Sequence, residues 1–336
     1  MSSVVDFPAV AGRPDTIGTD LRLDDLEPYR RELGGYCYRM LGSSFEADDA
    51  VQETMLRAWR AFDSFEGRAA LRSWVYRIAT NVCLDMLRGR QRRARPMEMG
   101  PSSTADPSHL GPMLAENLWT TPVPDSRVLP DNGDPAEMAE AKETVRLAFV
   151  AALQHLPARQ RAILILREVL RWRATEVAEL LDTSVASVNS ALQRARATLA
   201  AQDLSPGATP SVEAGQEELL ARYVDAFERY DVERLVTLLH DDAIQSMPPY
   251  AMWMRGSDEI GRWWLGGGSG CRGSRLVPVR ANGGPAFGQY RIDPAGGYGP
   301  WAIQVIEISD GRIAGIHSFL DTDLFASFGL PAHLDD

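Results

Sequence analysis

The stretch that most constrains the fold runs over residues 174–196 and reads ATEVAELLDTSVASVNSALQRAR. Two helical patterns flank a short turn, Asp182-Thr183-Ser184, with the spacing of a helix-turn-helix. On the first helix Val177 and Leu181 should face inward, and Ala178 is small enough for two helices to cross closely. The stretch therefore predicts a compact helical module that binds DNA, although an ordinary helical hairpin would show a similar pattern.

The second helix of this motif carries the surface that would meet DNA. Ser184 is a natural N-cap, because its hydroxyl can accept from the first free backbone N–H groups. Val185, Val188 and Leu192 should form the buried stripe. The expected exposed set is Ala186, Ser187, Asn189, Ser190, Gln193, Arg194 and Arg196. Short polar side chains near the start of the helix can approach base edges, while arginines reach phosphates.

Charge is unevenly distributed along the chain. The formal net charge is −11 and Lys142 is the only lysine, yet residues 68–95 hold eight arginines against the single carboxylate of Asp85. A polyanion responds to a local patch of this kind and not to the net charge. Because uncompensated charge of one sign is costly, we expect the arginines from Arg88 to Arg95 to contact phosphates.

The same arginine-rich segment is interleaved with aromatic residues. Phe62, Phe65, Trp74 and Tyr76 lie in or near the loop and helix that carry these arginines. Aromatic groups beside arginines are how proteins hold unstacked bases next to a charged backbone channel. The alternative is that Trp74 and Tyr76 belong to a hydrophobic core, and for Trp74 the two interpretations carry equal weight.

Hydrophobic periodicity and Pro/Gly-rich stretches divide the chain into parts. We expect a disordered N-terminus (residues 1–22), a helical module (23–95), a linker (96–137), a second helical module (138–200), a short linker (201–214) and an α+β tail (215–332). Within the tail, four alternating segments at 275–282, 285–292, 301–311 and 312–321 read as strands. Leu118 and Trp119 suggest that part of the long linker docks on another part of the protein.

Two long segments then make a family resemblance specific. DDAVQETMLRAWRAFDSFEGRAALRSWVYRIATNVCLDMLRGRQRR resembles region 2 of the extracytoplasmic-function group of sigma-70 factors of bacterial RNA polymerase. HLPARQRAILILREVLRWRATEVAELLDTSVASVNSALQRARATL resembles region 4 of the same family. The resemblance covers roughly residues 24–95 and 138–200. It implies a multidomain chain with two all-α sigma domains, a region 2 helical bundle and a region 4 helix-turn-helix, which together direct promoter-specific transcription initiation.

The resemblance also implies which surfaces meet polymerase and DNA. The helix from Asp48 to Phe62 would bind the β′ clamp helices, and region 4 would lie near the β flap. The positions carried over for polymerase are Asp48, Asp49, Gln52, Glu53, Leu56, Arg57 and Trp59. The loop and helix from Ser64 to Arg93 would capture a flipped base of the melted −10 element. The residues carried over for that strand are Phe65, Arg68, Arg72, Trp74, Asn81, Asp85, Arg88, Arg92 and Arg93. The −35 duplex would be read by Ser187, Asn189, Ser190, Gln193, Arg194 and Arg196.

The tail is similar to the SnoaL-like branch of the nuclear-transport-factor-2-like fold, which is a curved sheet forming a cone with helices across it. The resemblance predicts an α+β cone that regulates the sigma regions in cis. A ligand pocket could be lined by Met247, Trp253, Trp264, Tyr290, Trp301 and His317, so a small molecule or a protein partner of the tail is left open. The candidate catalytic groups are His240, Asp241, Asp242 and His317, with His317 directed into the cone, but we expect no enzymatic activity.

Other features of the sequence bound its location and chemistry. The three cysteines, Cys37, Cys83 and Cys271, are read as reduced thiols, and no metal or cofactor is expected. No signal peptide and no bilayer-spanning run is expected, which favours a cytoplasmic protein. Two alternatives are a small-molecule enzyme with a vestigial N-terminal part and a helix-turn-helix repressor that acts without polymerase. The repressor leaves residues 48–93 unexplained, and the paired sigma motifs argue against the enzyme.

Overall fold

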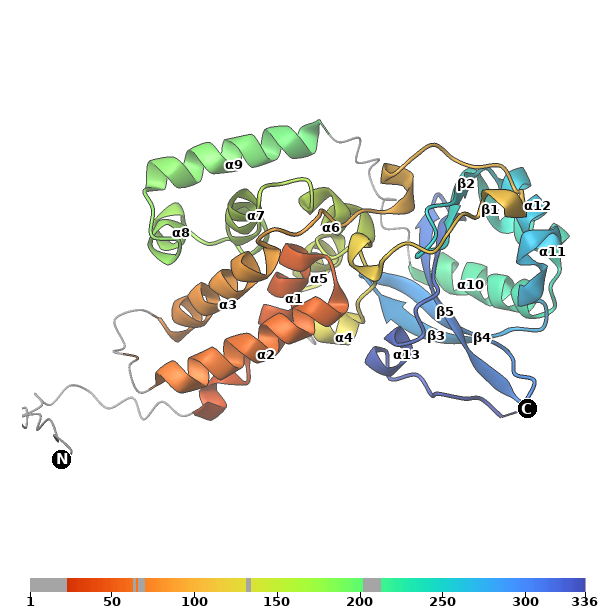
Figure 1. The fold of residues 1–336 in the computed structure, drawn as a ribbon, viewed down its shortest axis with the longest axis horizontal. Helices are drawn as coiled ribbons and strands as arrows, with labels where there is room; N and C mark the ends of the chain where they lie inside the picture. The colour runs from red at the N-terminus through yellow and green to blue at the C-terminus, as the bar shows by residue number, and fades with distance from the viewer. Residues whose placement is uncertain (1–22, 63–64, 66–69, 131–133, 202–212, 336) are drawn as a thin grey trace, which may run out of the picture.

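The computed structural model describes residues 23–62, 65, 70–130, 134–201 and 213–335. Figure 1 shows a helical half that carries the N-terminal elements and a sheet-containing half that carries the C-terminal ones. The predicted disordered N-terminus and most of the second linker lie outside the described residues. The two halves meet where the long linker, the segment that leads into the second helical module and one β-hairpin of the tail come together.

The helical half is built from short amphipathic helices. They are α1 (Tyr29–Leu41), α2 (Ser44–Ala61), α3 (Leu71–Leu87), α5 (Pro135–Glu143), α6 (Leu147–Leu153), α7 (Ala158–Leu164), α8 (Ala174–Leu180) and α9 (Val185–Ala200). Short 3-10 turns η1 (Leu23–Leu26) and a π-helical turn η6 (Ile165–Val169) complete it. Buried side chains of α1–α3 and of α6–α9 belong to one continuous hydrophobic core, so the two helical modules pack as one body. None of the described helices is long and apolar enough to cross a lipid bilayer.

The tail is a six-stranded sheet with helices on one face. Its strands are β1 (Leu239–Ser246), β2 (Trp253–Arg255), β3 (Arg275–Ala281), β4 (Gly284–Ile292), β5 (Tyr298–Ser309) and β6 (Arg312–Phe319). The spatial order is β2-β1-β6-β5-β4-β3, with β1 and β6 parallel and the other pairs antiparallel. The four strands expected from the sequence are confirmed as β3–β6, whereas β1 and β2 went unrecognised because their sequences do not alternate cleanly.

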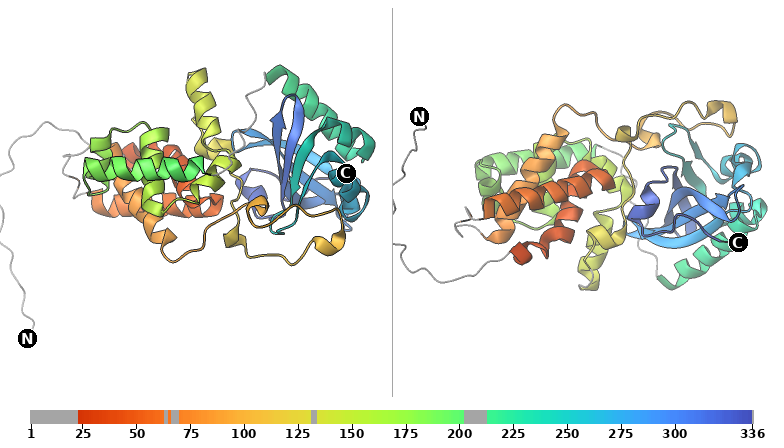
Figure 2. Two further views of the ribbon diagram at one scale, coloured as in Figure 1. Left: turned by 90° about the horizontal axis from the view of Figure 1, so that it is seen from above. Right: turned by 60° about the horizontal axis from the view of Figure 1, so that its bottom comes forward.

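The two faces of this sheet have separate cores. Helices α10 (Glu213–Glu228), α11 (Val232–Leu238) and α12 (Ser257–Leu265) contribute to the core on one face, followed by η7 (Gly267–Cys271). The core on the other face includes α13 (Leu324–Ser327) and Leu147 from α6 of the helical half. Figure 2 shows the sheet enclosed between α10 on one side and the helical half on the other. This is the α+β cone expected from the sequence.

The long linker lies on the tail surface along much of its length. It contains η3 (Pro96–Glu98), η4 (Pro107–His109), η5 (Glu116–Leu118) and α4 (Asp125–Val128). Ser103 N–H donates to the Trp253 carbonyl at 2.7 Å, and Leu114 N–H donates to the Pro249 carbonyl at 3.0 Å. The expectation that the part with Leu118 and Trp119 docks is confirmed, because the Trp119 ring is buried. In Figure 1 the linker crosses from the end of α3 to the tail and returns at α4.

Candidate nucleic-acid interface

Helix α9 presents an exposed polar face. The expected exposed residues Ser187, Asn189, Ser190, Gln193, Arg194 and Arg196 are all exposed. Among the described residues, Arg194 donates only to the neighbouring Ser190 hydroxyl, at 2.7 Å, whereas Arg196 forms an ion pair with Glu168 at 2.7 Å. Figure 1 shows α9 along the outer edge of the helical half, above α8 and α7. This face is shaped to enter a major groove.

The turn before α9 behaves as its residue types suggest, with one exception. The Ser184 hydroxyl accepts from the Ser187 N–H at 3.1 Å, which confirms the N-cap. Asp182 has a positive φ of 50°, the left-handed conformation that Asp tolerates better than most residues. Val188 and Leu192 are buried, but the prediction for Val185 was wrong, since it is 38% exposed. Val185 is the first residue of the helix, where the apolar stripe has not yet reached the core.

Helix α2 displays a stripe of mixed apolar and acidic character. Asp49, Gln52, Leu56 and Trp59 are exposed, with 57% of Trp59 accessible. Phe45, which the sequence interpretation missed, is also exposed and continues the stripe at helical spacing. Asp48, Glu53 and Arg57 flank the stripe and are partly held by ion pairs, Asp48 with Arg127 of α4 and Arg57 with Glu53 at 2.6 Å. Exposed large apolar side chains in such a row suit a protein partner better than DNA.

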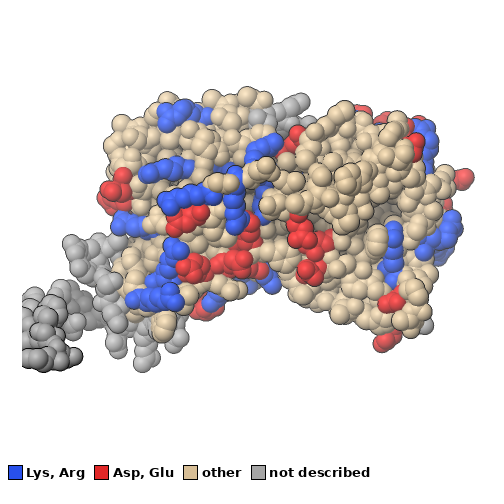
Figure 3. All heavy atoms as spheres, in the orientation of Figure 1, with Lys and Arg blue, Asp and Glu red and all other residues tan. Residues whose placement is uncertain are grey.

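The expectation that the arginine-rich segment carries uncompensated charge was wrong. Most of its arginines have acidic partners from other elements, which a count along the segment could not include, and Arg88 pairs with Asp85 within the segment. The ion pairs are Arg72–Glu32, Arg88–Asp85 (3.1 Å), Arg90–Glu46, Arg92–Glu98 (2.8 Å), Arg93–Glu46 (2.8 Å) and Arg95–Glu98 (3.3 Å). Figure 3 shows basic and acidic residues interleaved over the helical half. Most of these pairs are partly exposed and therefore weak, so they can be exchanged for phosphates.

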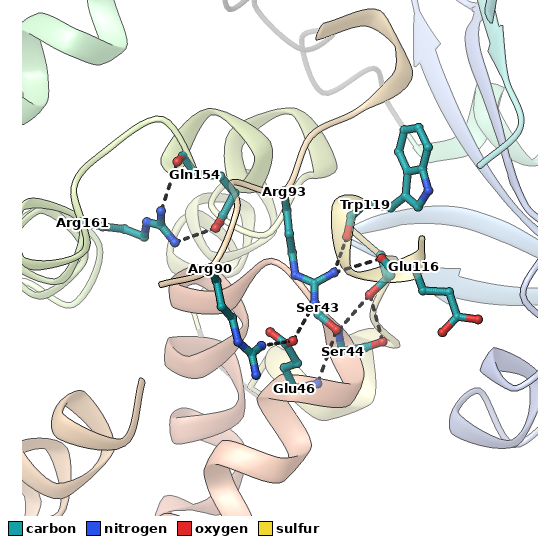
Figure 4. A network of polar contacts seen from close by, with 10 residues as sticks. Ser43, Ser44, Glu46, Arg90, Arg93, Glu116, Trp119, Gln154 and Arg161 are labelled. Carbon is teal, nitrogen blue, oxygen red and sulfur yellow. Dashed lines mark hydrogen bonds and ion pairs between the residues drawn. The ribbon is translucent and has the colours of Figure 1, made fainter. Parts of the chain in front are cut away.

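Arg93 differs from its neighbours because it is buried. It is only 7% exposed and donates to the Trp119 carbonyl at 2.7 Å and the Glu116 carbonyl at 3.3 Å. Burial lowers the pKa of its guanidinium. Figure 4 shows Arg93 reaching between the start of α2, at Glu46, and the linker. In this arrangement Arg93 fastens the linker to the helical bundle, and its expected contact with phosphate stays a prediction.

Helix α3 is partly covered by the second helical module. The Arg72 guanidinium lies 5.3 Å from the Tyr76 ring and 5.1 Å from the ring of Trp172, which precedes α8. Tyr76 and Trp172 are themselves in contact at 5.1 Å between ring centroids. Arg77 donates to the Glu179 carbonyl of α8 at 2.9 Å. Tyr76 is therefore a core residue, and Arg72 is engaged at the contact between the two modules.

The other candidate readers of a single strand lie at the edge of this contact. Asn81 is exposed and lines a groove that also holds Asp182 and Leu181 of the helix-turn-helix. Asp85 and Arg88 are exposed beyond it, and Arg92 is held by Glu98 and by the His155 ring, whose Nε2 lies 2.6 Å from the guanidinium. Trp74 is half-buried, with ring contacts to Phe65 at 5.0 Å and Phe62 at 6.3 Å. Arg68 lies outside the described residues.

Arg161 shows how firmly the two modules are joined. This buried α7 residue donates to the Met40 carbonyl at the end of α1 and to the Gln154 side chain at 2.5 Å. It also reaches the Gln154 and Leu156 carbonyls, both at 3.1 Å. Burial lowers the pKa of Arg161 to about 10, so it stays charged at neutral pH. A cation that satisfies several carbonyls at helix ends is a strong tie between region-2 and region-4 helices.

The candidate residues of the tail are divided between the two faces of the sheet. Met247, Trp264 and Trp301 line a cavity on the helix-covered face. Trp253 is buried beside the linker, where its indole N–H donates to the Gly100 carbonyl at 2.9 Å. Tyr290 packs on Phe325 on the opposite face, with 5.1 Å between ring centroids. The structure therefore brings together three of the six side chains.

None of the four candidate catalytic groups, His240 included, lines this cavity. Asp241 and Asp242 are exposed, and the Asp241 side chain is 94% accessible. His317 was expected to point into the cone, and this was wrong. Ile316 and Ser318 line the cavity, and side chains alternate along a strand, so His317 faces the other side. There its Nδ1 lies 2.8 Å from the Ser246 hydroxyl and its Nε2 lies 3.4 Å from the Glu307 carboxylate.

One asparagine of the β3–β4 turn joins all the parts of the chain. The Asn282 amide donates to the Tyr38 hydroxyl of α1 and to the Val145 carbonyl before α6, both at 2.7 Å. Its Oδ1 accepts from the linker N–H of Val123 at 3.1 Å. The Tyr38 hydroxyl in turn donates to the Thr121 carbonyl at 2.7 Å. We call this set of contacts the joint; it holds the first module, the linker, the second module and the tail together.

A neighbouring pair of contacts completes the joint. The Gly283 N–H donates to the Asp125 carboxylate of α4 at 2.7 Å, and Arg280 approaches the same carboxylate at 3.3 Å. Gly283 has a φ of +77°, and a Cβ there would lie 2.7 Å from the Lys142 carbonyl oxygen. Only glycine fits this turn without displacing the backbone that leads into the second module.

Comparison with known proteins matches both helical modules and the tail. Residues 26–93 match sigma-70 region 2, residues 146–199 match sigma-70 region 4, and residues 220–316 match a SnoaL-like domain. A Mycobacterium tuberculosis protein, ECF RNA polymerase sigma factor SigG, is 46% identical over 317 residues, spanning 92% of this chain and 83% of the relative. ECF RNA polymerase sigma factor SigJ of the same species is 27% identical over 319 residues, spanning 91% of this chain and 93% of the relative.

A solved structure shares the whole architecture. The crystal structure of the Mycobacterium tuberculosis extracytoplasmic function sigma factor SigJ covers 92% of this chain and 100% of its own, with a TM-score of 0.60 and 24% identity. The likeness extends over both the helical modules and the tail. The order of region 2, region 4 and SnoaL-like domain, together with the 46% identity to SigG, places this chain in the extracytoplasmic-function group of the sigma-70 family of RNA polymerase sigma factors.

Proposed function

We propose that the chain directs promoter-specific transcription initiation through three surfaces with separate tasks. The α2 stripe binds core RNA polymerase at the β′ clamp helices, α3 and the loop before it hold the melted −10 strand, and α9 reads the −35 duplex. The observation that carries this proposal is the pair of matched sigma regions in order, with the predicted reading residues of α9 exposed.

The α2 stripe supports the polymerase contact. Leu56 and Trp59 supply apolar area, and Asp49 and Gln52 lie between them on the same face. Large aromatic side chains that are exposed in a free protein are typical centres of protein–protein interfaces. We include Phe45 in this surface, and we place Asp48, Glu53 and Arg57 at its rim.

The −10 surface needs a change of arrangement before it can act. The −10 and −35 elements are separated by roughly 25 base pairs, or about 85 Å of B-form DNA. In the free chain Arg77 of α3 is bonded to α8 of the helix-turn-helix itself. The two reading surfaces therefore cannot serve both elements at once in this closed arrangement, and polymerase must hold the modules apart.

The tail acts in cis by stabilising the closed arrangement. Asn282 bonds simultaneously to region 2, the linker and the start of region 4. Removing such a contact leaves buried polar groups without partners, which costs about 1–3 kcal/mol for each group. The tail therefore restrains initiation until polymerase or another input releases the joint.

A binding role for the tail is better supported than catalysis. Among the described residues that line its cavity there is no aspartate, glutamate or histidine. A general base must lie within hydrogen-bond reach of the proton that it removes, and the four candidates lie elsewhere. We therefore propose a non-enzymatic protein that works in the cytoplasm, where its polymerase partner is, without a cofactor.

Run-off transcription with core polymerase on genomic fragments tests the proposal. We expect specific transcripts with the full-length chain and more of them after truncation near residue 205, because the tail no longer holds the joint. Core polymerase that stays silent on every fragment, with and without the tail, would overturn the assignment. Equal transcription by the two forms would overturn only the role of the tail.

A further inference from the structure

The tail contains a cavity of about 270 Å³ on the helix-covered face of its sheet. Aromatic rings form much of its wall, including Tyr223 and Phe227 of α10, Trp263 and Trp264 of α12, and Trp301 of β5. Ligand pockets are of this kind, mostly apolar with a few fixed polar groups, and this volume lies near the small end of their range. The cavity can therefore hold a molecule of one or two rings.

A row of glutamines crosses the floor of the cavity. The Tyr223 hydroxyl donates to Gln304 at 2.9 Å, Gln304 donates to Gln289 at 2.8 Å, and Gln289 donates to the Ser274 hydroxyl at 3.1 Å. Gln245 on β1 also lines the cavity and is only 4% exposed. Its Oε1 has no hydrogen-bond partner among the described residues. A buried acceptor of this kind is costly unless something donates to it.

A cation lies three strands away from Gln245, with β6 and β5 between them. The Arg291 guanidinium on β4 is stacked on Trp301, with its central carbon 3.4 Å from the ring centroid. Trp301 occupies a register shift between β4 and β5, which directs its side chain toward this face. One Arg291 amino group donates to the Cys271 sulfur at 3.0 Å, while its Nε has no partner among the described residues. No carboxylate lines the cavity among those residues, so Arg291 is available to an anion.

The linker between the two sigma regions covers this cavity. Pro107 and Leu110 of the linker are lining residues. Their segment is anchored on both sides, by the Ser103 N–H on the Trp253 carbonyl and by the Leu114 N–H on the Pro249 carbonyl. The Ala105 N–H also donates to the Glu259 carboxylate of α12 at 2.8 Å. Residues 103–114, which we call the lid, thus form a wall of the cavity while belonging to the sigma half of the chain.

We infer that this cavity binds a small aromatic anion of one or two rings, with a hydroxyl donor directed to Gln245 and an anionic oxygen directed to Arg291, and that the lid closes over it. The aromatic walls match a flat ring system, and the two unpartnered polar atoms fix its ends. The lid makes the site a sensor, because occupancy changes contacts of the same linker that runs on to the joint. That coupling rests on the proposed function, whereas binding itself does not.

Titration of the full-length chain with 6-hydroxy-2-naphthoate tests the binding without polymerase. This fluorescent probe has two fused rings, a hydroxyl at one end and a carboxylate at the other. We expect saturable binding in the sub-millimolar range with quenching of tryptophan fluorescence. Arg291→Ala and Gln245→Leu should each weaken the binding by roughly tenfold or more. The probe 2-naphthoate lacks the hydroxyl, so its affinities for the wild type and for Gln245→Leu should differ less.

The control variant is Tyr290→Phe, which alters a buried aromatic residue on the opposite face of the same strand. It should bind the probe as the wild type does, and thermal unfolding of every variant checks that each is folded. Hydrogen exchange of residues 103–114 should slow when the probe is bound. Absence of saturable binding, or binding that Arg291→Ala and Gln245→Leu leave unchanged, would overturn the inference. Binding without slower exchange in residues 103–114 would contradict the closing of the lid over the bound molecule and leave the cavity as a simple ligand site.

Discussion

The two helices proposed to read the promoter are in opposite states in the free chain. The polar face of α9 is open, and Arg194 there is bonded only to Ser190 of its own helix. On α3, Arg72 is stacked on Trp172 and Arg77 is bonded to Glu179, both from the second module. The surface for duplex DNA is thus ready, while the surface for a single strand is partly covered by the module that carries the other reader.

This difference gives a physical order to initiation. The −35 face requires no rearrangement, whereas exposing α3 means breaking contacts with region 4 and loosening the joint at Asn282. We therefore expect such a chain to bind isolated promoter DNA weakly, because only one of the two proposed readers is available. Polymerase, by holding both modules on separate surfaces, supplies the energy that opens them.

The largest expected effect follows from disabling the open reader. Asn189→Ala combined with Arg194→Ala removes two proposed contacts, and each specific base contact is worth about 1–3 kcal/mol. Transcription from a promoter with an intact −35 element should fall at least tenfold in run-off assays. Arg196→Ala is the matched control with a smaller effect, since that side chain is already paired with Glu168. An equal loss of transcription in the double variant and in Arg196→Ala would show that α9 contacts only the DNA backbone and not the bases.

The second effect comes from the joint. Asn282→Ala leaves the Val145 carbonyl and the Val123 N–H without their partners, at about 1–3 kcal/mol for each buried group. The chain should unfold at lower temperature, yet transcribe several-fold more with core polymerase, because the closed arrangement is weakened. A variant that is less stable and also less active would contradict a restraining tail.

A smaller effect is expected from the contact that covers α3. Arg77→Ala removes the bond to the Glu179 carbonyl without leaving a buried cation unpaired. Initiation should rise about twofold, in line with about 0.5 kcal/mol for a single exposed hydrogen bond. Arg88→Ala provides the comparison, because Arg88 pairs only with Asp85 of its own helix end. Loss of that side chain should reduce initiation through the −10 strand, so the two variants should differ in sign.

The smallest effect concerns pH and Asp125. Burial raises the pKa of its carboxyl, although the Gly283 N–H and Arg280 oppose the rise. The folded state therefore binds the proton of Asp125 more tightly than the unfolded state does. The resulting contribution to folding stability is fully present below the ordinary pKa of Asp and is lost as the pH rises through the raised pKa. Asp125→Asn keeps an acceptor for Gly283 and should be as stable as wild type at acidic pH and slightly more stable at neutral pH. Thermal unfolding at several pH values checks this, and a variant less stable at neutral pH would contradict it.

The sequence predicts the open reader better than the covered one. Local periodicity is enough for α9, since burial there depends on one helix packing on its own module; only Val185, at the helix start, departs from it. The partners of the α3 arginines, such as Glu32, Glu46 and Glu98, come from other elements. A window of sequence therefore showed a charge excess that the fold removes.

The tail shows the same limit. Strands β3–β6 alternate clearly, but β1 begins LHDDAIQS and carries exposed acids, so neither β1 nor the orientation of its partner β6 could be assigned. That is why His317 was placed on the wrong face. The glutamines and Arg291 of the cavity carry no spacing signature, because their proximity arises from pairing of strands distant in sequence.

The closed arrangement is tested most directly by a distance between spin labels on α3 and α9. Ala70→Cys and Ala200→Cys, in a Cys271→Ser background, place labels at two exposed positions, while Cys37 and Cys83 are buried. Double electron–electron resonance should give one narrow distance distribution for the free chain. With core polymerase and promoter DNA, the distance should increase by tens of ångströms toward the separation of about 85 Å between the two elements. An unchanged distance in the polymerase complex would contradict the claim that α3 is released from region 4 when initiation begins.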